Sequence, residues 1–316
     1  MLTPSELRER LTGVMPFVPT PFRATDLELD LEGLRANIQF LVERGVQSLG
    51  MCGFAGEFPS LTYEEYSQAI QVAVEAAAGR ALVIAGVGHG TKTAIQFARQ
   101  AQTLGADCVM LLPPNIVDPP DEGIYQHLKA IAHSVDIGVM LHSMPGSAAL
   151  TPDVIARLTD LSNVVAYKDE LRDIRLFHDI RNRVGNRLVY VSANGEKMIR
   201  YYFMEGMGVL ATAMGNFDPI LIQEVYQHAA TQQYEQLNQL IEAKVAPWYR
   251  LREKDRAYLI AVTKESMTML GLCGGVPRLP LWPIPDADRD RLRQILARLG
   301  YISASTTAGN RLDASS

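Results

Sequence analysis

The stretch Asn163-Val164-Val165-Ala166-Tyr167-Lys168-Asp169 is a short apolar run that ends in one lysine and one aspartate. Its length and its β-branched residues predict a buried strand. An amine at the carboxyl end of a buried strand loses hydration, which favours its neutral form, and a neutral amine can attack a ketone to form a Schiff base. We therefore predict that Lys168 is a nucleophile. The alternative is that Lys168 merely ends the strand and pairs with Asp169 at the surface.

Other short apolar runs alternate with longer amphipathic segments at a regular spacing, which is typical of strand–helix units. Helix start signals support this pattern, because Thr62 with Glu65 forms a capping-box sequence and Thr151-Pro152 precedes another apolar helical face. Eight strands are predicted, at residues 13–17, 48–51, 81–85, 107–112, 137–141, 164–168, 188–192 and 208–212.

Eight parallel strands, each followed by a helix, can close into a barrel, which leaves no sheet edge exposed. The predicted fold is α/β, a (β/α)8 TIM barrel with a C-terminal helical appendage. An open doubly wound sheet is the main rival, but the first strand–helix turn, Thr20-Pro21-Phe22, lacks the glycine pattern that such folds use for a pyrophosphate. We expect the barrel, with a short N-terminal helix, at 1–230, a C-terminal helical region at 231–302 and a disordered tail at 303–316.

Composition excludes several classes of function. The 316 residues are 47% hydrophobic and 21% charged, with a formal net charge of −5 and no continuous cationic stripe. Nucleic acid and membranes are therefore not expected partners. The N-terminal residues do not read as a secretion signal, so we expect a cytoplasmic protein. Three widely spaced cysteines and scattered histidines lack metal-ligand spacing, so neither a metal nor a cofactor is expected.

In a barrel of this kind, the chemistry gathers where strands meet the following loops. Lys168 is the one lysine among the residues expected there, and we expect no carboxylate within a few ångströms of its amine. Three polar residues at other predicted strand ends are candidate contacts for substrate hydroxyls, namely Ser143, Asn194 and Asn216.

A glycine-bounded turn, Gly53-Phe54-Ala55-Gly56, follows the second predicted strand. Its backbone N–H groups can converge on an anion, so all four residues are candidates for binding a substrate carboxylate. The plainer interpretation is that Gly53 and Gly56 only let the chain enter the next helix. We expect Glu57 to hold the turn rather than to touch substrate.

These motifs resemble the dihydrodipicolinate synthase/N-acetylneuraminate lyase family. The resemblance rests on the G-x-x-G-E turn at 53–57 with Leu61-Thr62, on Pro16-Phe17-Val18-Pro19-Thr20-Pro21-Phe22, on Gly86-Val87-Gly88 and on Tyr167-Lys168-Asp169. Residues 56–66, 136–139 and 254–271 look most similar to the 5-dehydro-4-deoxyglucarate dehydratase branch. The resemblance implies a barrel, a Schiff-base lysine at Lys168, a small 2-oxo acid substrate and a homo-oligomer, a tetramer or a dimer.

The chain departs from this family beside the lysine. Family members usually have a tyrosine in a Tyr-Asn-x-Pro-like segment after the fifth strand, where this chain reads His142-Ser143-Met144-Pro145. One account gives His142 the acid–base work of that tyrosine, because imidazole titrates near neutral pH. The other makes His142 a hydrogen-bonded histidine in a pocket that has lost its proton relay. In addition, Phe54 and Ala55 stand where relatives carry hydroxyl groups, which predicts a narrower and less polar pocket.

The predicted function is a lysine-dependent lyase that dehydrates or cleaves a small, sugar-derived 2-oxo acid, with His142 transferring protons. A noncatalytic 2-oxo acid binding protein with a degenerate site is the alternative. A metal-dependent aldolase would need clustered ligands, and His89 and His142 are the only histidines at predicted strand ends.

Overall fold

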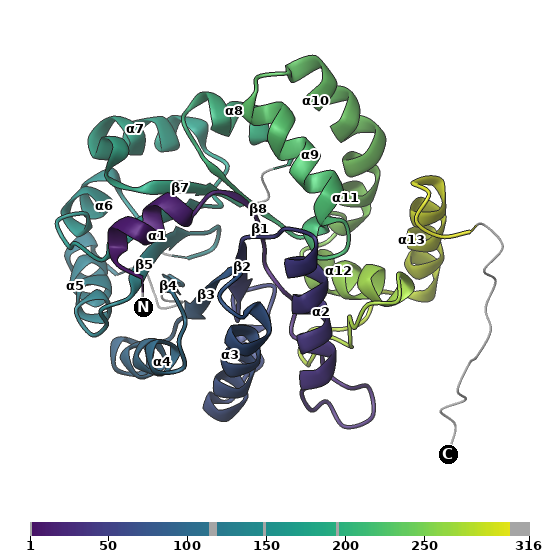
Figure 1. Cartoon of the computed structure of the whole chain (residues 1–316), viewed down its shortest axis with the longest axis horizontal. Helices are drawn as coiled ribbons and strands as arrows, with labels where there is room; N and C mark the ends of the chain where they lie inside the picture. The colour runs from purple at the N-terminus through teal and green to yellow at the C-terminus, as the bar shows by residue number, and fades with distance from the viewer. Residues whose placement is uncertain (1, 114–118, 148–149, 194–195, 304–316) are drawn as a thin grey trace.

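The barrel predicted from the sequence is confirmed. The computed structural model describes residues 2–113, 119–147, 150–193 and 196–303. Within these residues, eight parallel strands form one sheet in the order β1-β8-β7-β6-β5-β4-β3-β2. A parallel bridge between Phe17 and Gly50 joins β1 to β2, and the Val18 N–H donates to the Gly50 carbonyl at 2.9 Å. The sheet is thus nearly closed, with helices around it (Figure 1).

The strand boundaries lie within two residues of the predicted ones. They are β1 (Gly13–Pro16), β2 (Ser48–Met51), β3 (Leu82–Val87), β4 (Cys108–Leu111), β5 (Gly138–Ser143), β6 (Val164–Asp169), β7 (Val189–Ser192) and β8 (Val209–Thr212).

The helices of the barrel are α1 (Pro4–Arg10), α2 (Leu31–Glu43), α3 (Tyr63–Ala77), α4 (Thr91–Thr103), α5 (Asp121–Ala132), α6 (Pro152–Leu158), α7 (Ile174–Val184), α8 (Ile199–Met204) and α9 (Pro219–Ala230). Helices α2 to α8 lie between successive strands of the barrel in the sequence, α1 precedes β1 and α9 follows β8. The predicted capping box begins α3, because the Thr62 hydroxyl accepts from the Glu65 N–H and the Glu65 carboxylate accepts from the Thr62 N–H.

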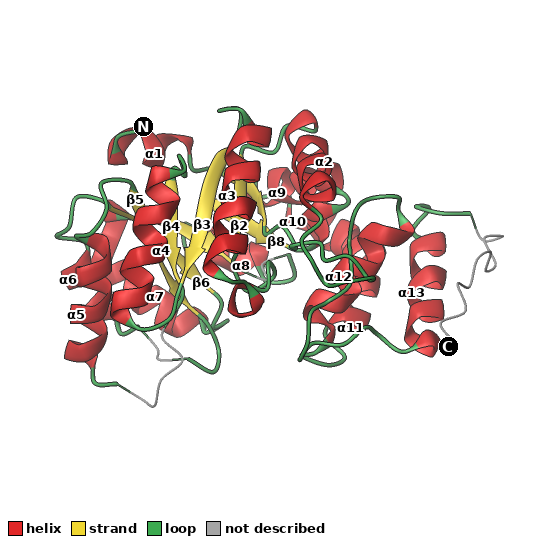
Figure 2. Ribbon diagram, turned by 90° about the horizontal axis from the view of Figure 1, so that it is seen from below, coloured by secondary structure: helices red, strands yellow, loops and turns green. Residues whose placement is uncertain are grey.

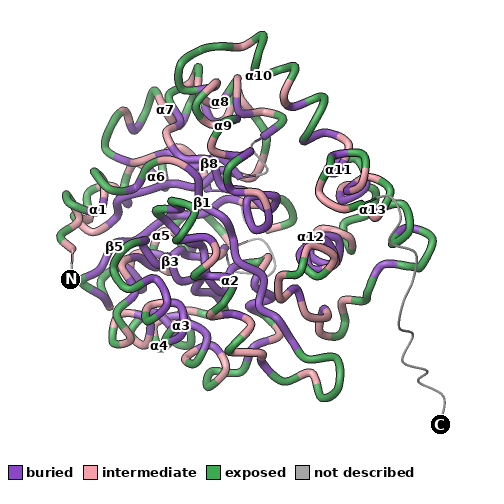
Figure 3. The backbone as a smooth tube through the Cα atoms, turned by 45° about the vertical axis from the view of Figure 1, so that its right-hand side comes forward, coloured by how far each residue is buried: buried purple, intermediate pink, exposed green. Residues whose placement is uncertain are grey.

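Apolar side chains close the barrel interior at the end where the strands begin. Leu7 and Leu11, in α1 and just after it, pack with apolar side chains inside the barrel. At Gly138 a Cβ atom would lie 2.1 Å from Leu7 Cδ2, so a side chain at this position of β5 would force Leu7 to move. The strands are buried along their length (Figure 3), and the opposite end of the barrel is where a site can form.

Four further helices follow the barrel, within the C-terminal helical region expected at 231–302. They are α10 (Tyr234–Leu240), α11 (Ala246–Arg252), α12 (Tyr258–Met269) and α13 (Asp286–Arg298), and a π-helical turn at Ile241–Val245 connects α10 to α11. Helices α11, α12 and α13 lie on one side of the barrel (Figure 2). Trp248 of α11 packs edge-on against Phe217, with the ring centroids 5.3 Å apart.

The division of the chain at residue 230 stays a prediction, and residues 304–316 of the expected tail lie outside the described residues. None of the described helices combines the length and the apolar character that a membrane crossing requires.

Candidate active site

Lys168 and His142 meet inside the mouth of the barrel. They occupy paired positions on the neighbouring strands β6 and β5. The Lys168 Nζ atom lies 2.9 Å from His142 Nε2, and the two residues are only 4% and 1% exposed. The structure therefore brings together the lysine and the imidazole that the sequence singled out.

Glu170 completes a three-membered cluster. Its Oε2 atom lies 3.2 Å from Lys168 Nζ and 3.1 Å from His142 Nε2. The expectation that no carboxylate lies near the amine is wrong. The physical reason is the two-residue period of an extended chain, which turns Glu170 to the same side as Lys168 just beyond the end of β6.

Asp169, by contrast, is not the partner of the lysine. It is buried, and its carboxylate accepts hydrogen bonds from Tyr202 at 2.7 Å and from Tyr167 at 3.2 Å. The alternative in which Lys168 pairs with Asp169 at the surface is therefore wrong. The Asp169 contacts fix the end of β6 from its outer side, where neighbouring residues of a strand must point.

The charges of the cluster follow from its burial. Burial, together with the charge of Lys168, lowers the pKa of His142 to about 4, so its imidazole is neutral near pH 7. Burial alone would raise the pKa of Glu170, but the charge of Lys168 and the hydrogen bond from His142 outweigh it and hold that pKa well below its usual range. The cluster thus combines an amine, a neutral imidazole and a carboxylate within a hydrogen bond of one another.

A cavity opens over this cluster. The Phe17 ring lies under it, with its centroid 4.7 Å from Lys168 Nζ. The other described residues in the cavity wall are Phe54, Ala55, Met110, His142, Glu170, Ala193, Ala211, Thr212, Ala213 and Arg252. The wall is largely apolar apart from the cluster, Thr212 and Arg252, an arrangement typical of small-molecule sites.

The glycine turn at residues 53–56 borders this cavity. The turn is tight, because the Glu57 N–H donates to the Phe54 carbonyl at 3.0 Å and the Phe58 N–H to the Gly53 carbonyl at 3.2 Å. At Gly56 a Cβ atom would lie 3.0 Å from the backbone of Cys52, which explains the glycine there. Among the described residues, the N–H groups of Ala55 and Gly56 have no hydrogen-bond partner.

Of the four predicted turn residues, Phe54 and Ala55 line the cavity, whereas Gly53 and Gly56 shape the backbone behind it. Phe54 is 40% exposed and also borders the neighbouring grooves, so its ring stands at the entrance.

The remaining predicted contacts are placed differently. Ser143 follows His142 on β5, is buried, and is not among the residues that line the cavity, because adjacent residues of a strand face opposite sides. The Asn216 side-chain amide donates to the carbonyls of Phe17 and Ala213 at 2.9 and 3.0 Å, which ties β1 to the end of β8. Asn194 lies outside the described residues.

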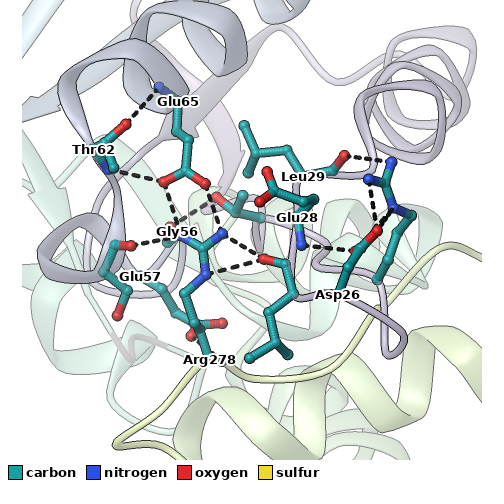
Figure 4. Close-up of polar contacts among 12 residues, drawn as sticks. Asp26, Glu28, Leu29, Gly56, Glu57, Thr62, Glu65 and Arg278 are labelled. Carbon is teal, nitrogen blue, oxygen red and sulfur yellow. Dashed lines mark hydrogen bonds and ion pairs between the residues drawn. The ribbon is translucent and has the colours of Figure 1, made fainter.

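Glu57 holds the glycine turn from behind. Its carboxylate forms an ion pair with Lys264 of α12 and accepts the backbone N–H of Arg278 at 2.9 Å. Figure 4 shows Arg278 reaching between Glu57 and Glu65, where its guanidinium pairs with the Glu65 carboxylate at 2.6 and 2.8 Å. These contacts tie the turn to the C-terminal helical region.

Sequence reasoning missed Glu170, Thr212 and Arg252. The two-residue period after Lys168 could have revealed Glu170. Thr212 stands at the end of a predicted strand, where its hydroxyl donates to the buried Glu196 and accepts the Gly215 N–H at 3.0 Å. Arg252 comes from α11, and no spacing in the sequence connects that helix to the barrel mouth. Among the described residues, no group of three histidine, cysteine, aspartate or glutamate side chains is arranged to bind a metal ion.

The fold and the site together define a (β/α)8 barrel protein with a buried lysine, imidazole and carboxylate at the carboxyl ends of β5 and β6. Residues 10–299 match the Dihydrodipicolinate synthetase family, and the chain belongs to that family. This agrees with the resemblance seen in the sequence motifs.

Named relatives extend over almost the whole chain. A protein of Bradyrhizobium sp. (strain ORS 278) named "Probable 5-dehydro-4-deoxyglucarate dehydratase" is 31% identical, with 97% of this chain and 98% of the relative covered. A protein of Leptothrix cholodnii with the same name is 33% identical, with coverages of 95% and 99%.

Solved structures agree with the fold. Dihydrodipicolinate synthase from Oceanobacillus iheyensis superposes with a TM-score of 0.88 at 28% identity, covering 93% of this chain and 98% of that one. The Acinetobacter baumannii synthase, solved in complex with pyruvate, gives a TM-score of 0.86 at 27% identity and covers 92% and 100%.

Proposed function

We propose that this protein is a lyase that forms a Schiff base between Lys168 and a small, sugar-derived 2-oxo acid, and that it removes water from that acid. The observation that carries the proposal is the position of Lys168 Nζ, buried at the barrel mouth 2.9 Å from the neutral His142 imidazole and 3.2 Å from the Glu170 carboxylate. The names of the similar proteins favour 5-dehydro-4-deoxyglucarate as the substrate.

The first step is imine formation. The Lys168 ammonium passes a proton to His142 or Glu170, both within hydrogen-bond distance, and the neutral amine attacks the ketone carbon. A carbon–nitrogen bond forms and the ketone oxygen leaves as water. The substrate carboxylate next to the ketone would lie against the backbone N–H groups of Ala55 and Gly56.

The second step is elimination. The protonated imine acts as an electron sink for the adjacent CH2 carbon. His142 or Glu170, which lie beside Lys168, can therefore accept a proton from that carbon. The electron pair then expels the hydroxyl on the next carbon, which takes up a proton and departs as water. Hydrolysis of the unsaturated imine consumes one water and restores the lysine, so the net reaction is the loss of one water.

Borohydride trapping with mass detection tests this proposal. We expect borohydride to fix one 2-oxo acid, such as pyruvate, onto Lys168, and we expect 5-dehydro-4-deoxyglucarate to lose the mass of one water on incubation with the protein. Reversible binding without any adduct would instead make the chain a noncatalytic binding protein. Turnover without an adduct would exclude the Schiff base but not the lyase.

We expect His142→Ala to lower kcat by about 10²-fold or more while changing KM by much less, because general acid–base catalysis is worth about 10²–10⁴-fold in rate. Steady-state kinetics with the dehydration substrate gives both constants, and trapping of pyruvate shows whether the variant retains its site. An unchanged kcat would leave His142 as a buried hydrogen-bonded residue without a part in proton transfer.

The homo-oligomer and the cytoplasmic location expected from the sequence stay predictions. Sedimentation of the purified protein would measure the first, and fractionation of cells would measure the second.

A further inference from the structure

Glu196 is a buried carboxyl group behind the cavity that holds Lys168. It lies after β7 and is 0% exposed. Its Oε1 atom is hydrogen-bonded to the hydroxyl of Thr212, which lines that cavity from the end of β8. Its Oε2 atom has no hydrogen-bond partner among the residues that the structure describes. Glu196 does not line the cavity itself, so the Thr212 hydroxyl connects the two.

The surroundings of Glu196 favour its protonated form. Burial raises the pKa of this carboxyl, and Thr212, Tyr249 and the charge of Arg252 offset that shift only in part. Tyr249 and Arg252 both belong to α11. An ionised Glu196 would also leave Oε2 buried without a hydrogen bond, which is costly for a charged oxygen. A carboxyl group that keeps its proton can serve as an acid.

The Thr212 hydroxyl can carry a proton between Glu196 and the cavity. A hydroxyl oxygen donates one hydrogen bond and accepts two. One acceptor position of Thr212 Oγ1 is filled by the Gly215 N–H at 3.0 Å. When Glu196 is ionised, the Thr212 proton points to the carboxylate. When Glu196 is protonated, the carboxyl proton fills the second acceptor position, and the Thr212 proton is free to point into the cavity.

The hydroxyl that departs in the proposed elimination needs a proton donor, because hydroxide is a poor leaving group. His142 and Glu170 lie at Lys168 Nζ, where they would accept the proton of the CH2 carbon. Among the described residues that line the cavity, Thr212 is the only one with a hydroxyl side chain. A hydroxyl supplied by a buried acid is suited to protonate the departing oxygen.

We propose that Thr212 donates the proton that converts the departing hydroxyl into water, and that Glu196 replaces that proton on Thr212. This inference rests on the proposed function. As the carbon–oxygen bond breaks, its electron pair stays on the oxygen, which takes the Thr212 proton. Thr212 takes the carboxyl proton, and Glu196 is left ionised. After product release, exchange with water removes the proton held by His142 or Glu170 and returns one to Glu196.

A competing role for Glu196 is purely structural. Its hydrogen bond to Thr212 could merely tie the segment after β7 to the end of β8. In this role its loss would disturb the cavity for every substrate alike. The two roles differ in their dependence on the leaving group, because fluoride departs as an anion near pH 7 and needs no proton.

Glu196→Gln separates these roles when kcat is measured for two substrates. One is 5-dehydro-4-deoxyglucarate, and the other is the same 2-oxo acid with fluorine in place of the departing hydroxyl. The amide keeps the shape of the side chain but has no acidic proton. We expect kcat for water loss to fall by about 10²-fold or more, the scale of general acid catalysis, and fluoride release to change by less than about threefold.

Variants of Thr212 test the same pathway with the natural substrate alone. Thr212→Val should lower kcat for water loss as Glu196→Gln does, whereas Thr212→Ser keeps a hydroxyl and should lose much less. Because both residues act in one proton transfer, the double variant of Thr212→Val and Glu196→Gln should lose no more than the more affected single variant. Losses that multiply in the double variant would overturn the pathway.

Two controls keep the result interpretable. Exchange of the pyruvate methyl hydrogens with heavy water requires the imine and the base but no leaving group, so it reports whether the Lys168 site of each variant is intact. Thr212→Val and Thr212→Ser decide the matter if Glu196→Gln does not exchange pyruvate. Glu205→Gln removes a carboxylate that pairs with His178 at 2.9 Å on the helices outside the barrel, so it should leave kcat unchanged.

Equal losses of water removal and fluoride release, or an unchanged kcat in a variant that still exchanges pyruvate, would overturn the role of Glu196 and leave the lyase standing. Wild-type protein that neither exchanges pyruvate hydrogens nor removes water would overturn the proposed function, and this inference with it.

Discussion

Replacing Lys168 with arginine is expected to abolish the borohydride-trapped adduct and to lower turnover by at least about 10³-fold, the scale seen when a covalent nucleophile is removed. The guanidinium keeps its proton and cannot condense with a ketone. It also keeps a positive charge beside Glu170, which sits 3.2 Å from the native amine. The variant therefore cannot form a Schiff base but keeps a positive charge beside Glu170.

A matched control shows that labelling is specific to this lysine. Lys254 is half-exposed and pairs with Asp288 at 2.7 Å, so Lys254→Arg should retain both the adduct and the turnover. Circular dichroism of the Lys168→Arg protein reports whether the barrel is intact. If the folded variant turned over substrate at the original rate, the Schiff-base mechanism would be wrong.

The alternation of apolar runs and amphipathic segments was enough to predict the barrel. Each strand is four to six residues long and buries at least three of them, so its apolar run is visible in the sequence, and a closed parallel sheet is the arrangement that uses eight such runs. Strand ends were less certain. For example, β5 continues through His142 and Ser143, two residues past its predicted end, because pairing with β6 continues to Asp169.

Site residues could be predicted where each of them lies on a predicted strand. Lys168 and His142 lie at paired positions of adjacent strands, so identifying both strands was sufficient to bring them together. The same two-residue period, applied one step further, would have added Glu170 and removed Ser143. Residues at a strand end are therefore not equivalent, because only alternate side chains face the barrel interior.

The contribution of the C-terminal helices was not predictable, because it depends on tertiary packing. Arg252 reaches the cavity from α11, and Lys264 reaches Glu57 from α12, more than two hundred residues along the chain. No local periodicity encodes such pairings. A buried lysine in a helix reads as an interruption of the apolar face until its partner is known.

Glu57 and Lys264 form a buried ion pair. Their side chains are 0% and 1% exposed. We expect Lys264→Met to lower the free energy of unfolding by about 3–5 kcal/mol, because removing one partner leaves the other charge buried without compensation. Urea titration of the variant and the wild type measures the difference. Replacing both residues, as Lys264→Met with Glu57→Gln, should recover part of the loss.

An exposed ion pair provides the comparison. Arg250 and Glu242 lie 2.8 Å apart, with side chains 64% and 68% exposed, so Arg250→Met should cost no more than about 1 kcal/mol. If Lys264→Met were no more destabilising than Arg250→Met, the buried pair would not hold the glycine turn as we describe.

The pH dependence of stability checks the same lysine independently. Burial lowers the pKa of Lys264 to about 8, and the charge of Glu57 only partly offsets that shift. Between pH 8 and the ordinary lysine value near 10.5, the unfolded chain therefore binds more protons at this residue than the folded chain does. Linkage then requires the Lys264 contribution to raise the free energy of unfolding as pH increases through this window.

Subtracting the free energy of unfolding of Lys264→Met from that of the wild type at each pH isolates this contribution. A difference that falls with pH would contradict the burial of a charged lysine. Because Glu57 holds the turn that would bind the substrate carboxylate under the proposed function, the folded variant should also bind pyruvate more weakly.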